Sequence, residues 1–81
     1  MYYPSGALYA ELNEEEHRYF YEDGTLKTVE PYLDGKLHGV VLLYWPNGKL
    51  KRKVHFQHGI RKGQDQMYNM EGLLVDEESY V

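Results

Sequence analysis

The chain has 81 residues, enough for one small domain, and it contains no cysteine, which excludes disulfides and thiolate metal sites. Hydrophobic residues make up 42% of the sequence and aromatic residues 15%, which argues against disorder despite a net charge of −4. The longest apolar run, residues 40–45, is too short to span a bilayer, and the N-terminus lacks the features of a signal peptide, so we expect a cytoplasmic protein.

A repeat of 24 residues runs along the chain. Both glycines and large apolar residues recur at this step, so several independent columns agree on one unit. The glycine columns are Gly24, Gly48 and Gly72; Gly35 and Gly59; and Gly39 and Gly63, and the apolar columns are Phe20, Tyr44 and Tyr68; Leu26, Leu50 and Leu74; and Tyr32, Phe56 and Tyr80. We expect a single domain over residues 1–81, with an atypical first unit (1–18) and a truncated last unit (67–81).

Two kinds of turn divide each unit into strands. Short segments that end in glycine predict three-residue hairpin loops, in which the glycine adopts a left-handed conformation. These segments are Pro4-Ser5-Gly6, Glu22-Asp23-Gly24, Pro46-Asn47-Gly48 and Met70-Glu71-Gly72. Asp34-Gly35 and His58-Gly59 predict a second turn, and the Tyr-, Val- and Leu-rich runs between turns predict strands. The expected fold is all-β, a single curved antiparallel meander of repeated β-hairpins.

The three-residue loop also predicts a register for the central hairpin. It pairs Trp45 with Lys49 and Tyr44 with Leu50, and continued outward it gathers the apolar columns on one face. The residues expected to be largely buried there are Leu26, Leu42, Tyr44, Leu50, Val54 and Phe56. Arg52 is the polar exception on that face.

Charge is distributed in three blocks. Residues 1–35 carry eight acidic and two basic side chains, residues 36–63 carry seven basic and no acidic ones, and residues 64–81 carry five acidic and no basic ones. One interpretation is that neighbouring strands of opposite charge attract each other within the sheet. The other is that the basic block steers an acidic partner to the surface.

Part of this sequence resembles a known family. The run from Tyr44 to Lys51, with its Trp-Pro-Asn-Gly-Lys-Leu core, and the later Gly59 and Gly63 are similar to the bacterial variant of the MORN repeat, in particular to the YwqK-type antitoxin family. The resemblance covers residues 19–72 well and the ends loosely. It implies a curved sheet of hairpins that binds other molecules without doing chemistry, and it associates the chain with scaffolding, phospholipid contact and toxin neutralisation.

The basic hairpin is the strongest functional signal. Because Lys49, Lys51 and Lys53 alternate along a strand, we expect them to share one face, with Arg52 opposite. Trp45, Tyr21 and Tyr19 are expected to flank this charge. Lysines beside exposed aromatic rings suit a protein surface or anionic lipid headgroups, and nucleic acid is not expected because acidic blocks lie on both sides. The alternative is a charged surface that only keeps the sheet soluble.

No other cluster predicts chemistry. The carboxylates of Glu14, Glu15 and Glu16 lie at a shortened turn, where a solvated hairpin end is expected. His55 and His58 lack the neighbours of a metal site, and the two serines lack a nearby base. We therefore expect no catalytic residue, metal or cofactor.

Two functional hypotheses follow. The leading one is a non-enzymatic protein-interaction module, of the antitoxin or immunity type, that neutralises a partner by binding it. The alternative is a peripheral module that binds anionic phospholipids. Exchange of acidic and basic patches between two copies also predicts a weak, salt-sensitive homodimer.

Overall fold

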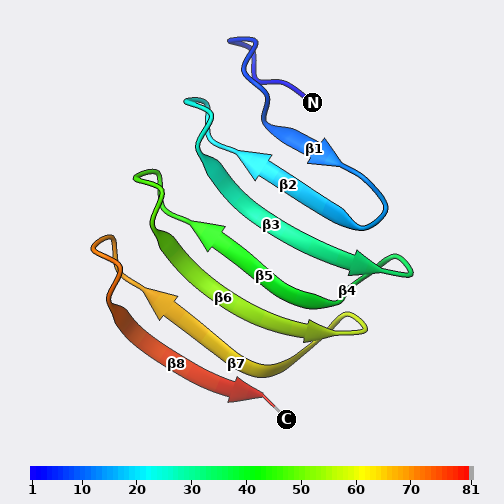
Figure 1. Cartoon of the computed structure of the whole chain (residues 1–81), viewed down its shortest axis with the longest axis vertical. Coiled ribbons are helices and arrows are strands. Elements are labelled where there is room, and N and C mark those ends of the chain that lie inside the picture. The colour runs from blue at the N-terminus through cyan, green and yellow to red at the C-terminus, as the bar shows by residue number, and fades with distance from the viewer. Residues whose placement is uncertain (81) are drawn as a thin grey trace.

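The computed structural model describes residues 1–80, which form an antiparallel sheet of eight strands without any helix (Figure 1). The strands are β1 Ala10–Leu12, β2 Glu16–Phe20, β3 Leu26–Leu33, β4 Lys36–Leu37, β5 Gly39–Tyr44, β6 Leu50–Gln57, β7 Ile60–Tyr68 and β8 Leu74–Tyr80. They follow one another across the sheet in chain order, except that the short β4 pairs only with β3. The predicted all-β meander is confirmed. The described residues offer no helix that could cross a membrane.

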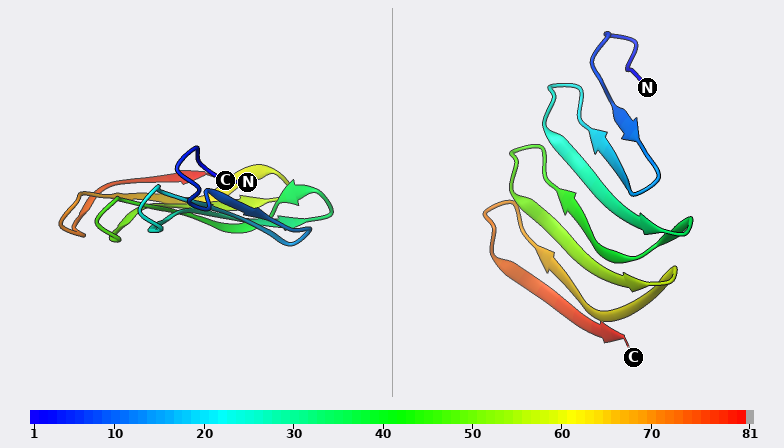
Figure 2. Two further views of the ribbon diagram at one scale, coloured as in Figure 1. Left: turned by 90° about the horizontal axis from the view of Figure 1, so that it is seen from above. Right: turned by 45° about the vertical axis from the view of Figure 1, so that its right-hand side comes forward.

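The sheet is a single curved layer. It measures 42 × 35 × 13 Å, and Figure 2 shows it from above as a thin band with no second layer on either face. Among the described residues, the buried hydrophobic side chains are Ala10, Val41 and Val54, and one carboxylate, Asp65, is buried with them. Most other strand residues are half-buried, so each strand depends mainly on its neighbours within the sheet.

The three-residue loops form as predicted, and they stack along one side of the sheet (Figure 1). In the central loop, the Gly48 N–H donates to the Trp45 carbonyl at 2.9 Å, and the Trp45 N–H donates to the Lys49 carbonyl at 2.8 Å. Gly24 and Gly48 have φ angles of 91° and 88°, as expected for the left-handed position of this turn. We call the four loops closed by Tyr3–Ala7, Tyr21–Thr25, Trp45–Lys49 and Asn69–Leu73 the hairpin tips.

The opposite side of the sheet carries tighter turns. Asp34 and His58 have positive φ angles of 52° and 50°, and the glycine after each is also positive, which defines two-residue type I′ turns. Four residues beyond each turn glycine, Gly39 and Gly63 have φ angles of 113° and 87°. The first glycine of each Gly-x-x-x-Gly motif therefore makes the turn, and the second redirects the chain into the next stretch of strand.

A β-bulge two residues beyond each of the last three tips changes the expected register. Tyr44 pairs with Leu50 as predicted, but the next pair is Leu43 with Arg52, so Lys51 is an extra residue. The same shift follows the pairs of Phe20 with Leu26 and of Tyr68 with Leu74. The bulge therefore recurs every 24 residues, at Lys27, Lys51 and Val75.

Because of the bulge, the predicted set of buried residues is only partly correct. Val54 is buried as expected, but its partner across the hairpin is Val41 rather than Val40. Leu42 faces Lys53 on the other side of the sheet and is only half-buried. The remaining residues of the predicted core are also half-buried, because no other part of residues 1–80 covers either face: Leu26, Tyr44, Leu50 and Phe56.

Alanine substitutions at two glycines can separate the cost of backbone strain from the cost of a clash between the added Cβ and a neighbouring side chain. A Cβ on Gly48 would meet no atom within 4 Å, so Gly48→Ala should cost only the left-handed backbone strain, about 1–2 kcal/mol. A Cβ on Gly39 would lie 3.2 Å from Pro31 Cγ at a φ angle of 113°, so Gly39→Ala should cost more. Urea denaturation of both variants tests this order, and equal losses of unfolding free energy would contradict it.

Candidate binding surface at the hairpin tips

Aromatic side chains link each of the first three hairpin tips to the next unit. The Tyr21 hydroxyl donates to the Tyr44 carbonyl at 2.8 Å, and Trp45 Nε1–H donates to the Tyr68 carbonyl at 3.1 Å. In the first unit, the Tyr3 hydroxyl donates in the same way to the Phe20 carbonyl at 2.6 Å. These bonds join equivalent positions of successive units, so they fix the rings in a regular row along the tips.

The bulge residues lie against these rings. Lys27 Nζ lies 5.5 Å from the centre of the Tyr21 ring, and Lys51 Nζ lies 4.8 Å from the centre of the Trp45 ring. Both distances are within the range of a cation–π interaction. In the first unit, Tyr9 takes the place of the lysine. We call this set the tip row: Tyr3, Tyr9, Tyr21, Lys27, Trp45 and Lys51.

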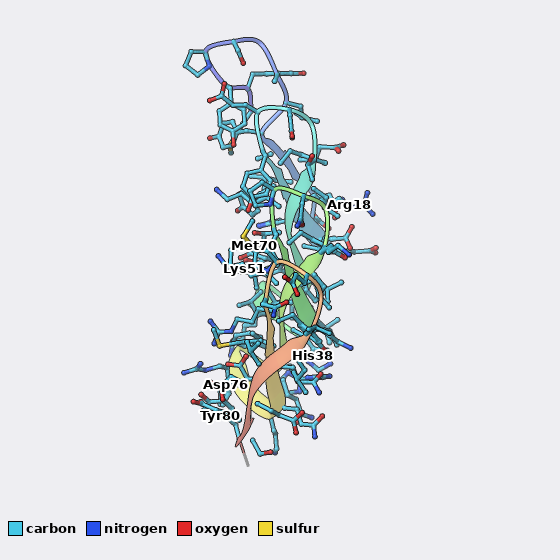
Figure 3. The ribbon with its side chains drawn as sticks, turned by 90° about the vertical axis from the view of Figure 1, so that its left-hand side faces the viewer. Arg18, His38, Lys51, Met70, Asp76 and Tyr80 are labelled. Atoms are coloured by element: carbon cyan, nitrogen blue, oxygen red, sulfur yellow. The ribbon has the colours of Figure 1, made fainter. Side chains whose placement is uncertain are left out.

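The bulge also decides which basic side chains share a face. Arg52 pairs with Met67 on β7, and Met67 pairs with Asp76 on β8, so these three side chains lie on the same face of the sheet. Figure 3 shows Asp76 on the same side of the sheet as Lys51 and Tyr80, with Arg18 on the other side. We call these the Lys51 face and the Arg18 face.

The predicted arrangement of the basic side chains is therefore wrong. Lys51 and Arg52 lie on the same face, because the bulge places two successive side chains there. Lys53 is in register with Leu42 and Gln66, on the Arg18 face. Tyr19 pairs with Thr28, and the pairing continues through Leu43 to Arg52, so Tyr19 lies on the Lys51 face. It lies in line with Arg52 across the strands and is not part of the tip row.

Arg52 is engaged by an acidic side chain of the next strand. Its Nε donates to Asp65 Oδ1 at 2.9 Å, and its second bond, from Nη2 to Asp65 Oδ2, completes a bidentate pair. Arg61 Nη1 lies 3.7 Å from the same carboxylate, of which only 4% is exposed. The hydrogen bond from Arg52 lowers the pKa of Asp65, and the same bond raises the pKa of Arg52. This pair is structural, so Arg52 is not available as a free binding residue.

The lysines of the basic block remain free of such pairs. Among residues 1–80, the ion pairs of this block involve Arg52 and Arg61, both with Asp65. Attraction between neighbouring charged strands therefore explains the positive charge of the two arginines, but it does not explain the charge of Lys49, Lys51 or Lys53. Of these, Lys49 closes the Trp45 tip, and its Cδ would lie 3.8 Å from a Cβ on Gly72 of the next tip.

The histidines do not gather into a metal site within the described part of the chain. The rings of His38 and His58 lie 4.9 Å apart between their centres and are tilted by 48°, and the His58 backbone N–H donates to His38 Nδ1. No group of three or more histidine, cysteine or acidic side chains suited to a metal occurs within residues 1–80. Nδ1 of His55 is bonded to the Gln64 carbonyl at 2.8 Å.

The structure brings together four of the seven predicted site residues at the tips: Tyr21, Trp45, Lys49 and Lys51. It places Arg52, Lys53 and Tyr19 elsewhere. Sequence reasoning missed Lys27, although the 24-residue step from Lys51 pointed to it. It also missed Asp65, whose pairing with Arg52 depends on the irregular register near Gly63.

Comparison with known proteins identifies a family. The family described as MORN repeat variant matches residues 16–34 and 37–62, which is more than half of the chain. Searches of curated proteins and of solved structures found no match.

Replacement of Asp65 tests the buried ion pair. Asp65→Asn should lower the unfolding free energy by about 1.5–3 kcal/mol at neutral pH, the usual loss for a hydrogen bond to a charged group. Because folding lowers the pKa of Asp65, its contribution is fully present above the unfolded pKa of about 3.9 and is lost as the pH falls below that value. The difference between wild type and variant, measured by urea denaturation from pH 7 to pH 3, should therefore shrink in acid. A difference that stays constant over this range would contradict the assignment.

Proposed function

The chain belongs to the MORN repeat variant family, and from this premise we propose that it is a non-enzymatic protein-interaction module. MORN repeats are generally modules that bind proteins or membranes. The observation that supports the proposal most is the tip row, in which lysines lie against aromatic rings at 24-residue steps. Such a row offers a partner a regular line of charge and flat apolar area.

The tip row suits an acidic protein surface. Trp45 and Tyr21 are held by hydrogen bonds to the neighbouring unit, so little side-chain entropy would be lost when a partner covers them. Lys27, Lys49 and Lys51 carry charge that no carboxylate within residues 1–80 neutralises through an ion pair. Aromatic and basic side chains together are typical of the residues that dominate protein interfaces, and the lysines would speed association with an acidic partner.

The finer part of the proposal is an antitoxin or immunity-type role in the cytoplasm, in which the chain neutralises a toxin by covering it. Binding alone is enough for such a role, so it needs no catalytic residue. A toxin-like reading frame transcribed together with this gene, whose product binds the chain stoichiometrically, is the expected finding. A neighbouring product that does not bind would contradict the role.

A second candidate function is the binding of anionic phospholipid, because lysines beside Tyr and Trp rings also suit the interface of a membrane. Flotation with vesicles containing phosphatidylserine separates the two functions. Binding at low salt that is lost at high salt supports the lipid function, and no binding at low salt excludes it.

The proposal also includes a weak homodimer, in which the acidic strand β8 of one copy meets the lysines at the hairpin tips of another, Lys27, Lys49 and Lys51. Sedimentation should then show a dimer at low salt that dissociates at high salt. A monomer at high protein concentration and low salt would contradict it.

Charge reversal at the tips tests the protein-binding function. Wild-type chain should capture a stoichiometric partner from native lysate, and a Lys49→Glu, Lys51→Glu variant should lose at least nine-tenths of it, because both changes repel an acidic surface. Lys36→Glu is the matched control, since Lys36 belongs to β4 on the opposite side of the sheet. Failure of the wild type to retain any partner, or equal losses in both variants, would count against the proposal.

A further inference from the structure

The outer edge of β8 differs from the equivalent edges of the earlier units. β3 and β6 occupy the same place in their units, and each has a strand on both sides, whereas within residues 1–80 β8 pairs only with β7. Leu26 and Leu50 are half-buried, but the equivalent Leu74 is 50% exposed. The last described unit therefore presents an edge of the kind that the earlier units cover with another strand.

One backbone N–H at this edge is bonded only to a neighbouring side chain. The Glu77 N–H donates to the side chain of Asp76, at 2.9 Å from Oδ1, so this N–H points away from β7. Local side-chain bonds of this kind compete with strand pairing for the same N–H. The equivalent residues on the covered edges, Val29 and Lys53, pair directly with the next strand, through Leu42 and Gln66.

The charge of this edge is strongly acidic. Asp76, Glu77 and Glu78 follow one another, and register places Asp76 and Glu78 on the Lys51 face and Glu77 on the Arg18 face. None of the three takes part in the ion pairs found within residues 1–80; Glu77 accepts hydrogen bonds from Gln64 and Gln66 instead. The edge therefore offers negative charge on both sides of the strand.

A second copy of the chain does not fit this edge as a paired strand. The other outer strand of the sheet is β1, which carries Glu11 and no basic residue, and β8 against β8 would bring the same carboxylates together. Like charges on facing strands are destabilising. The basic strand β6 is already paired on both sides. Charge complementarity thus favours a basic strand from another protein.

We propose that the outer edge of β8 binds an extended basic segment of a partner protein as an additional antiparallel strand. Antiparallel pairing follows because β5 and β7 run antiparallel to β3 and β6 on the equivalent edges. Basic side chains at three successive positions would meet Glu78, Glu77 and Asp76 in that order. An apolar side chain should follow, because the segment then reaches exposed apolar residues near the tip: Met70, Leu73, Leu74 and Val75.

This edge is separate from the tip row and attracts the opposite charge. Failure of this proposal can therefore be distinguished from failure of the tip row to bind a partner, since reversal of Lys49 and Lys51 leaves the carboxylates of β8 in place.

A designed peptide tests the proposal directly. Fluorescence anisotropy would follow a fluorescein-labelled Thr-Lys-Arg-Lys-Val-Tyr-Val-Thr peptide binding to the full chain. The same peptide with N-methyl groups on alternate residues keeps its charge but cannot pair with a strand edge, so it should bind at least tenfold more weakly. Glu77→Pro, which removes only an outward N–H from the backbone, should weaken binding at least tenfold, while Glu77→Gln should change it much less.

Charge variants complete the test. Asp76→Lys, Glu78→Lys should weaken binding at least tenfold, whereas the control Glu14→Lys, Glu15→Lys should stay within twofold, because Glu14 and Glu15 lie at the turn between β1 and β2. Equal binding of the N-methylated peptide would overturn the proposal in favour of charge attraction alone. Self-association of the chain that is abolished by Glu77→Pro would overturn it in favour of a second copy, and no binding of the basic peptide would also overturn it.

Discussion

The left-handed glycine of the hairpin tips, with the bulge that follows the last three of them, is the constraint on which the rest of this sheet depends. Gly48 lets three residues reverse the chain, and the extra residue Lys51 then shifts every later pair of the hairpin by one. Because side chains alternate along a strand, that shift decides which of them share a face. It places Lys51 over Trp45 and directs Arg52 to Asp65.

A sheet of one layer has consequences for both stability and function. It buries few apolar side chains, so hydrogen bonds between units, such as those from Tyr21 and Trp45, and the buried pair of Arg52 with Asp65 carry more weight than they would in a thicker domain. The same thinness leaves two faces and an outer edge open to partners. In the two proposals above, the tip row attracts acidic groups, and the edge of β8 attracts basic ones.

Local chemistry in the sequence was enough to predict the repeat, the turns and the first two pairs of the central hairpin, Trp45 with Lys49 and Tyr44 with Leu50. The bulge could not be predicted, because its positions hold Lys27, Lys51 and Val75, which share no turn-forming property. Because the predicted register lacked the bulge, it placed Lys51 and Lys53 on one face and Arg52 on the other, whereas Lys51 and Arg52 share a face. The partner of Arg52 was missed for a related reason, since it lies on the next strand beyond a second irregularity.

The cross-strand contacts of the central hairpin test the bulge most directly. In an NMR spectrum of the isotope-labelled chain, backbone nuclear Overhauser effects should connect Leu43 with Arg52 and Val41 with Val54. An unbulged hairpin would instead connect Leu43 with Lys51 and Val41 with Lys53. Observation of the second set in place of the first would contradict the shared face of Lys51 and Arg52, and with it the tip row as described.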